Sequence, residues 1–566
     1  MINSRFIWET ANMTIDSFYQ EINKSNFYLG MISQVYRENA YIQVENLSLL
    51  NHRNIQLEAL IPNTINYFVV IDSIQGLFVG EVYQSRVNSS DSVHTAMQSG
   101  KKESVFPEIG IEILGILNGN KLTSAGFKTV GIMDKVYVAN QFLIKTFVNS
   151  IELNEYPVKN SKGENKIDES GKIVYQKKLT NIAKLNEADS SYLSLKPNTL
   201  FDRHLLVIGT TNSGKSTSAL SVLDKLVLSG KKVLVIDPTG EYRDSFSDDE
   251  AEKLLLGENA FISTEDIDDL FWVNFFNLSD SEDSGKAAVL ANAISSLRFQ
   301  NSIGETGVLI KEHQSVSSLQ PKINSVTSRQ FDFNLLTEQI KHEAVKQKLN
   351  KDKGGYCFER DGNLYNASIW LIKKVGYFLK SSLVNDFFVT NTSDDNLFDK
   401  IDYFMSDENK KSLYINTSKV SKSGSAGASI INLITNHVLE SKVSASPFVL
   451  FIDEVHRYTR VYEEDGGLVS IAREGRKKGI FLFLTTQSPK DVPKIILGQV
   501  GTFIIHRITH YEELRAIENL LQPSTLSQIR KLAQGESIIT SINLLKDLHV
   551  YFEKTNRIHY NETPLL

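Results

Sequence analysis

The stretch HLLVIGTTNSGKSTSAL, residues 204–220, decides how the central part of the chain folds. The apolar run 204–208 is typical of a buried strand, and residues 209–216 match the pattern G-x-x-x-x-G-K-[ST]. Its glycines let the backbone turn N–H groups toward phosphates, and the helix that follows adds its positive N-terminus. A chance glycine-rich turn is the alternative, but the strand before the loop and the helix after it favour a nucleoside triphosphate site.

The chemistry of this loop assigns roles to individual side chains. Lys215 would reach the β- and γ-phosphates, and Ser216 would bind Mg²⁺. ATP and Mg²⁺ are therefore the expected cofactors. The predicted nucleotide-binding residues of the loop are Gly209, Thr210, Thr211, Asn212, Ser213, Gly214, Lys215, Ser216 and Thr217.

Polar side chains end three other apolar runs. In FVLFIDEVHRY, residues 448–458, Asp453 would hold the Mg²⁺ shell and Glu454 would orient or deprotonate the attacking water, since nucleotides bind at the carboxyl edge of such sheets. Gln487 ends GIFLFLTTQ and could hydrogen-bond the γ-phosphate or the water. Asp237 ends KKVLVID and could, with Glu241, tune the metal site or brace Lys215; a turn-forming Asp before a proline is the alternative.

Three arginines are candidates for a finger that reaches the γ-phosphate of a neighbouring subunit. SIAREGRKKGI, residues 470–480, places Arg473 and Arg476 late in a short helix, where the helix dipole alone also favours basic residues. Arg476 is the first choice and Arg473 the second. Arg203, directly before the phosphate-loop strand, is a further candidate.

Composition narrows the class of protein. The 566 residues suggest about three or four structural units. The net charge of -6 argues against a chain that coats nucleic acid non-specifically. A single cysteine, Cys357, excludes an intrachain disulfide framework. The apolar runs are too short to span a bilayer and the first residues do not resemble a secretion signal, so we expect a cytoplasmic protein without membrane contact.

The texture of the sequence divides the chain. Short β-branched and aromatic runs predict a small barrel, whereas alternating apolar strands and longer helical patterns after about residue 200 predict an α/β core with a parallel sheet. Charged stretches such as LTEQIKHEAVKQKLNKDKGG, residues 336–355, read as helical. The expected parts are an N-terminal extension (1–25), a β-barrel (26–153), a linker or hairpin (154–199), the core (200–279 and 406–550), a helical insertion (280–405) and a C-terminal tail (551–566).

With these residues assembled, the chain resembles the HerA family of ring-forming ATPases, relatives of the FtsK-type DNA pumps. The matching stretches are Arg203-His204, the phosphate loop, VIDPTGEY, FIDEVHR, AREGRKKG, TTQSPKDVP and GQVGTFIIHRI. The resemblance covers about residues 200–550 and extends more weakly to the barrel. It implies a RecA-like P-loop NTPase core with a helical insertion, preceded by a small HAS-barrel-like domain.

The resemblance also implies a function. Lys215, Asp453 and Glu454 would hydrolyse ATP, Arg476 would act across a subunit interface, and a homo-hexamer would translocate or remodel double-stranded DNA. A separate effector, a nuclease or a sirtuin-type NAD-consuming enzyme, would dock on the barrel face, in antiviral defence or DNA end processing. Asn212 stands where the family usually has Gly, and Thr239 where it typically has His. Residues 1–25 and 154–178 match poorly, so the choice of partner is not inherited.

Other interpretations remain open. The ring could be a nucleotide-stabilised scaffold that activates an effector without processive translocation. A two-lobed helicase would need a second lobe, for which little chain remains after Glu454. An N-K-x-D match at residues 165–168 suggests a GTPase but lies in a polar linker, and the pair His506 and His510 has metal-like spacing without nearby cysteines. DNA contacts are expected in the loop after Tyr458 and in the helical insertion.

Overall fold

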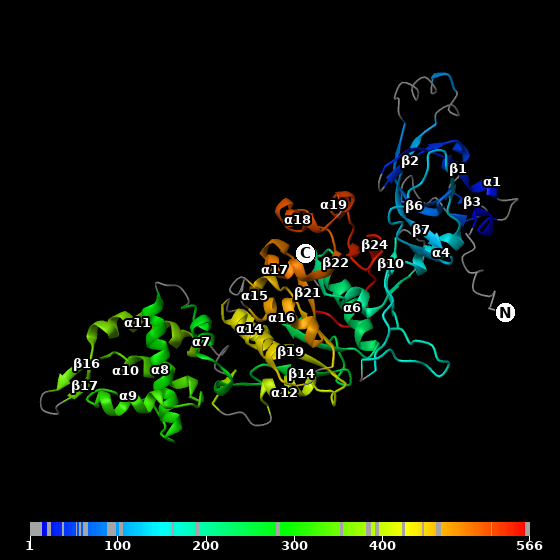
Figure 1. Ribbon diagram of the computed structural model, residues 1–566. Coiled ribbons are helices and arrows are strands. Elements are labelled where there is room, and N and C mark those ends of the chain that lie inside the picture. Colours follow the sequence, from blue (N-terminus) through cyan, green and yellow to red (C-terminus); the bar gives the residue numbers. More distant parts are fainter. Residues whose placement is uncertain are drawn as a thin grey trace. The chain divides into compact units, whose positions relative to one another are not determined.

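The computed structural model (Figure 1) forms two compact units, and each is described by itself. The first unit comprises Met1–Asp202 and Glu536–Glu553, and the second comprises Arg203–Gly535 and Lys554–Leu566. The structure describes residues 14–19, 24–36, 39–51, 54–55, 58–59, 66–87, 98–100, 106–160, 163–186, 192–278, 283–350, 355–380, 387–390, 395–421, 425–443, 446–459, 466–521 and 523–560.

A closed antiparallel barrel dominates the first unit. The strands pair in the order β2-β1-β9-β5-β6-β7, and β7 pairs back to β2, which closes the barrel. Alternating burial along β2 places Ala40, Ile42 and Val44 inside, as expected for strands with one face on a core. The barrel strands are β1 (Tyr28–Val35), β2 (Asn39–Val44), β5 (Phe68–Ser73), β6 (Gly76–Arg86), β7 (Glu108–Asn118) and β9 (Lys135–Val138).

The first unit contains further short elements besides the barrel strands. Isolated antiparallel bridges join Pro157 to Tyr175, Lys159 to Asn165 and Ile167 to Ile173, so three short segments pair with one another. A small antiparallel sheet joins β11 (Tyr192–Leu195), β10 (Leu179–Leu185), β24 (Leu548–Tyr551) and β23 (Glu536–Ser541) in that order. The remaining elements are α1 (Lys24–Phe27), α2 (Leu47–Asn51), β3 (Asn54–Ile55), β4 (Glu58–Ala59), β8 (Lys121–Thr123), α4 (Gln141–Asn149) and α5 (Pro197–Leu200).

The second unit is built on a parallel sheet whose strands run in the order β22-β12-β21-β20-β13-β19-β14. Its central strands are buried along their whole length, which explains their unbroken apolar sequences. The strands are β12 (His204–Ile208), β13 (Lys232–Asp237), β14 (Ala251–Leu255), β19 (Ser412–Asn416), β20 (Phe448–Ile452), β21 (Ile480–Thr486) and β22 (Val500–Ile505). The predicted fold, a small β-barrel followed in the sequence by an α/β core, is confirmed.

Helices flank this sheet (Figure 1). None of those described is both long enough and apolar enough to cross a bilayer. The longer ones are α6 (Lys215–Leu228), α12 (Leu397–Met405), α14 (Ser425–Glu440), α16 (Gly467–Glu474), α17 (Lys494–Gln499), α18 (Tyr511–Ile517) and α19 (Pro523–Ile529).

The segment between β14 and β19 is mostly helical but contains a hairpin that the sequence pattern missed. Residues 336–355 read as one helical stretch, yet α10 ends at His342 and β16 begins at Val345. β16 is mostly exposed and carries few apolar residues, so its sequence does not show the pattern of a strand, but it pairs antiparallel with the adjacent β17, whose Cys357 and Phe358 are buried. The elements are α7 (Asp269–Phe275), α8 (Ser284–Ser302), α9 (Val316–Asn324), α10 (Leu336–His342), β16 (Val345–Asn350), β17 (Gly355–Arg360) and α11 (Gly362–Lys380).

Glu536–Glu553 lie outside the second unit, although they fall within the range 406–550 that we expected for the core. β24 pairs with β10, with Lys184 opposite Tyr551, and so these residues belong to the small sheet of the first unit. The chain re-enters the second unit at Lys554.

Candidate nucleotide-binding site

The phosphate loop connects β12 to α6 in a conformation that its sequence requires. Gly214 is the residue before α6 and has a φ of 111°, which side chains with a Cβ rarely adopt. A Cβ on Gly214 would also lie 2.9 Å from the backbone Cα of Gly535. Asn212 has a φ of 62°, in the left-handed region that asparagine tolerates better than most residues. The loop therefore keeps the turn even though Asn212 replaces the usual glycine.

The residues that directly follow β22 contact the phosphate loop and the helix after it. Thr210 donates from its backbone N–H and from its hydroxyl to the carbonyl of Arg507, at 3.2 and 3.1 Å. The buried ring of His506 lies 2.8 Å from the Ser218 hydroxyl on α6. The sequence pattern indicates His506 only as half of a metal pair and gives no sign of this supporting position. Among the described residues, no group of three or more His, Cys, Asp or Glu is arranged to hold a metal ion without other ligands, so His506 and His510 gain no support as a metal pair.

Three neighbouring strands bring the catalytic candidates together. β12, β21 and β20 are adjacent and parallel, so Lys215, Gln487 and Glu454 all follow the same sheet edge. Lys215 and Glu454 form a buried ion pair. Gln487 Nε2 donates to Glu454 Oε1 at 2.5 Å, and Thr211 Oγ1 donates to Gln487 Oε1 at 2.9 Å. The amide of Gln487 thus connects the phosphate loop to the acidic strand.

The acidic pair is held by a threonine that the sequence analysis did not single out. The Thr485 hydroxyl donates to Asp453 and accepts a hydrogen bond from the backbone N–H of Glu454 at 3.0 Å. Glu454 itself has a φ of 50°, a strained conformation for a residue with a Cβ. Such strain persists where the surrounding structure fixes it, and here it directs the Glu454 carboxylate at Lys215. Thr485 could have been noticed as a polar residue near the end of an apolar strand.

The electrostatics of the site show a surplus of buried negative charge. Burial raises the pKa of Asp453 to about 6, against the opposing effect of Lys215. Burial, with Asp453 and Asp237 nearby, raises the pKa of Glu241 to about 7. Burial also opposes the ionisation of Glu454, but Lys215 and the hydrogen bond from Gln487 outweigh it and hold the pKa of Glu454 below its ordinary value.

Asp237 lies at the same sheet edge, but its oxygens are engaged with the chain that follows. Oδ1 accepts from the backbone N–H groups of Thr239 and Gly240, and Oδ2 accepts from the backbone N–H of Tyr242 and the hydroxyl of Tyr414. This is the turn-forming geometry of an Asp at a strand end. Its proposed contact with the nucleotide stays a prediction.

The three arginines lie at the opposite edge of the sheet from the phosphate loop. Arg203 precedes β12, and Arg473 and Arg476 precede β21, whereas the phosphate loop follows β12. At about 3.3 Å per residue, the path from Arg203 to Gly209 spans roughly 20 Å. All three arginines are exposed. Arg473 is in α16, and Arg476 is in a 3-10 turn, Gly475–Lys478, that ends at Gly479 with a φ of 77°.

The site fits a magnesium triphosphate. Asp453 and Glu241 would supply hard oxygen donors of the kind that Mg²⁺ prefers, and Ser216 would add a hydroxyl at the start of α6. A Cβ on Gly209 or Gly214 would collide with Ser213, His506 or Gly535, so the loop needs glycine at both positions to pack against its neighbours. ATP and Mg²⁺ are the cofactors for which this site is built.

Known proteins similar to this chain include HerA helicases. Residues 180–433 match the family described as "Helicase HerA, central domain". The chain is 25% identical over 399 residues to a probable DNA double-strand break repair helicase HerA of Methanocaldococcus jannaschii, covering 63% of this chain and 73% of the relative. It is 24% identical to the DNA double-strand break repair helicase HerA of Pyrococcus furiosus, covering 73% of this chain and 76% of the relative. Over its central part, this chain is thus similar to the HerA helicases.

This similarity agrees with the resemblance that the motifs suggested. Among solved structures, VirB4 of Thermoanaerobacter pseudethanolicus is 15% identical with a TM-score of 0.46, covering 66% of this chain and 96% of that chain. The chain is an ATP hydrolase of the translocase or helicase type, as its similarity to the HerA helicases and the grouping of Lys215, Gln487 and Glu454 indicate.

Proposed function

We propose that this chain is an ATP-driven translocase that acts on double-stranded DNA as a homo-hexameric ring. The observation that carries the proposal is the split of the machinery between two sheet edges. Lys215, Gln487 and Glu454 gather at one edge, and Arg203, Arg473 and Arg476 lie at the other. If one of these three arginines completes a site, it would come from another copy, in a head-to-tail contact that closes into a ring.

The residues have separable tasks in this proposal. ATP with Mg²⁺ supplies the phosphoanhydride bond that is broken. Lys215 would hold the β- and γ-phosphates, and Ser216 and Asp453 would hold Mg²⁺. Glu454 accepts the proton of the attacking water, because a carboxylate that is ionised near neutral pH can act as a base. Gln487, between the two, orients the water or senses the γ-phosphate.

The Lys215–Glu454 ion pair suggests how hydrolysis depends on binding. The Lys215 ammonium, which should meet phosphate, is paired with the Glu454 carboxylate. Binding of the triphosphate would draw Lys215 away and leave Glu454 with its hydrogen bond from Gln487. The base would therefore become available only when substrate occupies the loop.

DNA-stimulated ATP hydrolysis tests the proposal. Wild-type protein should release phosphate faster with double-stranded DNA, and Glu454→Gln should lower the rate by at least about a hundredfold while still binding ATP, because an amide cannot accept the proton. Glu518→Gln, at an exposed position in 3-10 helix η8 (Glu518–Leu520), is the matched control. DNA binding should weaken steeply with salt, since phosphate contacts dominate such affinity. A rate of ATP hydrolysis that double-stranded DNA does not change under any condition would contradict translocation.

We also propose that a separate effector, a nuclease or a sirtuin-type NAD-consuming enzyme, docks on the barrel, in DNA end processing or antiviral defence. Support comes from the loop between β8 and β9, where Phe127, Ile132 and Met133 are 99%, 68% and 70% exposed. These large apolar side chains lie within one loop, and large apolar side chains that gather on a surface are typical of protein interfaces. Copurification of the wild type and of a Phe127→Ser/Ile132→Ser/Met133→Ser variant, followed by mass measurement, should identify the partner and show its loss.

The alternative is a nucleotide-stabilised scaffold that activates the effector without processive movement. The Glu454→Gln variant separates the two functions. A scaffold would activate its effector normally in this variant, whereas a translocase would lose the effector's DNA-dependent activity. The expected loop for DNA contacts after Tyr458 lies in residues 460–465, outside the described residues.

A further inference from the structure

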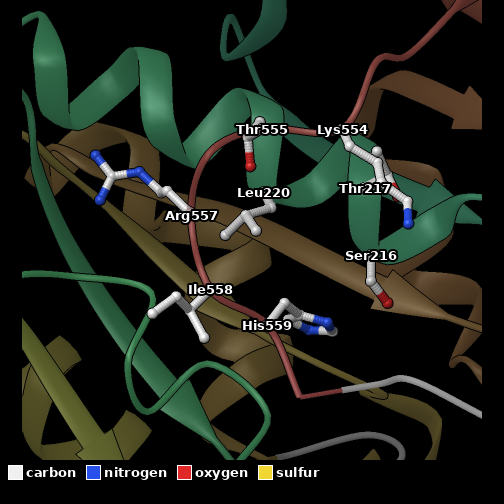
Figure 2. Close-up of a pocket in the computed structure, with 8 residues that line it drawn as sticks. All are labelled: Ser216, Thr217, Leu220, Lys554, Thr555, Arg557, Ile558 and His559. Carbon is white, nitrogen blue, oxygen red and sulfur yellow. The ribbon is translucent and has the colours of Figure 1, made fainter.

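The segment Lys554–Tyr560 returns to the second unit and crosses α6, the helix that begins with the phosphate-loop lysine. Figure 2 shows this segment passing beside Ser216, Thr217 and Leu220. We call Lys554–Tyr560 the strap. Two of its partners, Asp224 and Glu250, precede Arg557 by 333 and 307 residues in the chain. No local sequence pattern therefore indicates that the strap packs here.

Arg557 anchors the strap to the core. Its Nε donates to Asp224 on α6 at 2.7 Å, and Nη1 and Nη2 donate to the two oxygens of Glu250 at 2.9 and 2.8 Å. The guanidinium also lies over the ring of Phe246, 5.1 Å from its centroid. In Figure 2 it points away from the Ser216 side of the strap. Arg557 therefore fixes the strap without occupying the space beside the phosphate loop.

Further contacts fix the path of the strap after Arg557. The Ser245 hydroxyl donates to the carbonyl of Ile558 at 2.6 Å, and the backbone N–H of Tyr560 donates to the carbonyl of Glu241 at 3.1 Å. The His559 ring packs edge-on to the buried Tyr242, with centroids 4.5 Å apart. These hydrogen bonds and the ring contact hold the strap in a defined position against the core.

Between the strap and the start of α6 lies a pocket of about 270 Å³. Its lining combines the last residues of the phosphate loop with apolar and polar groups. Leu220 and Ile558 are apolar, and Ile558 is 55% exposed. Lys554, Thr555 and His559 add an ammonium, a hydroxyl and an imidazole. The lining residues are Ser216, Thr217, Leu220, Lys554, Thr555, Arg557, Ile558 and His559.

The direction of the triphosphate assigns an occupant to this pocket. Lys215 reaches the β- and γ-phosphates, and its partner Glu454 marks the γ end. The α-phosphate and the nucleoside must therefore leave the loop at its other end, where Ser216 and Thr217 line the pocket. A planar base with polar edges suits an apolar surface bordered by hydrogen-bonding groups.

We propose that the strap completes a nucleoside subsite, in which the base of the bound nucleotide packs on Ile558 and Leu220 and the ribose or base edge meets Lys554 or Thr555. This inference rests on the proposed function, because it assigns the remaining part of the same ligand. The phosphate loop gives affinity for the phosphates, and the strap adds affinity for the nucleoside.

Isothermal titration with ADP and with inorganic pyrophosphate separates the two parts of the site. Ile558→Asn should weaken ADP binding about tenfold, which corresponds to about 1.4 kcal/mol, and leave pyrophosphate binding within twofold. Arg557→Met should have the same selective effect, because it releases the strap from Asp224 and Glu250. Ile74→Asn is the matched control, since Ile74 is fully exposed in the barrel unit. Lys215→Ala should lose both ligands.

The outcomes distinguish the inference from the function beneath it. Equal affinity of wild type, Ile558→Asn and Arg557→Met for ADP overturns the nucleoside subsite, as does an equal loss of ADP and pyrophosphate binding. In either case a Lys215→Ala protein that binds neither ligand leaves the nucleotide site intact as a proposal. A wild-type protein that binds neither ADP nor pyrophosphate overturns both.

Discussion

Asn212 shows how one residue can depart from a family pattern and still serve the loop. Its φ of 62° falls where glycine is normally needed, and asparagine is among the few other residues that occupy this region at low cost. The departure therefore leaves the backbone path of the loop unchanged.

A pair of substitutions tests this account of Asn212. Asn212→Gly should keep ADP affinity within about twofold, since glycine adopts the same φ freely. Asn212→Val should lower the free energy of unfolding by about 1–2 kcal/mol and weaken ADP binding, because a β-branched residue resists a positive φ. Chemical denaturation and calorimetric titration measure the two effects. A valine variant that behaves as the wild type would mean that the loop can form with another backbone path.

Glu454 is a second residue of the site with a positive φ, and the sequence does not indicate this conformation. The sequence indicates an acidic pair at a strand end, but not that Glu454 is held at a φ of 50° or that its first partner is Lys215. The identity of the site could be predicted because strand-end carboxylates and a glycine loop are local patterns. Its resting ion pair could not, since it depends on which strands become neighbours.

At the scale of elements, the parallel sheet was predictable and its strand order was not. Long apolar strands separated by helical patterns indicate a buried parallel sheet wherever they occur. The position of β21 between β12 and β20 follows from crossovers that no short motif encodes, and it is this position that puts Gln487 between Lys215 and Glu454. The hairpin β16–β17 was misread as helix for a different reason, because the mostly exposed and charged β16 lacks the apolar alternation that indicates a strand.

The strap is an element that sequence reasoning left as an unassigned tail, and its anchor should be sensitive to acid. The hydrogen bonds from Arg557 lower the pKa of Glu250 to about 2, against the effect of burial. A group whose pKa is depressed by folding stabilises the fold above its ordinary pKa of 4.5, and this contribution is lost as pH falls from there toward about 2.

Thermal melting of wild type and Glu250→Gln at several pH values tests this anchor. At pH 7 the variant should be less stable by about 2 kcal/mol, as for a hydrogen bond to a charged group. The difference in melting temperature should narrow steadily below pH 4.5. The difference in melting temperature between wild type and Arg557→Met should narrow in the same way, because this substitution removes the same ion pair. A difference that stays constant from pH 7 to pH 3 would show that the Glu250 charge contributes nothing to folding.

At the scale of the whole molecule, the two sheet edges are the basis of the proposed head-to-tail assembly. A subunit that carries the phosphate loop at one edge and the candidate arginines at the other would present two half-sites to different neighbours. The net charge of -6 is compatible with DNA binding if a few basic groups from several copies converge on a central channel.

Mixing two inactive variants tests whether the half-sites combine between subunits. Lys215→Ala should abolish nucleotide binding in its own loop but keep Arg476, and Arg476→Ala should bind nucleotide but leave the neighbour's site incomplete. In a mixed ring, some Arg476→Ala subunits meet a neighbour that still supplies its arginine, so these interfaces regain hydrolysis. Phosphate release by an equimolar mixture should then exceed that of either variant alone, where removal of the arginine costs about a thousandfold or more. The same mixture with Arg473→Ala or Arg203→Ala in place of Arg476→Ala identifies which arginine acts across the interface. If no arginine variant combined with Lys215→Ala restores hydrolysis while each protein still forms rings, the arginines do not act between subunits and the head-to-tail arrangement fails.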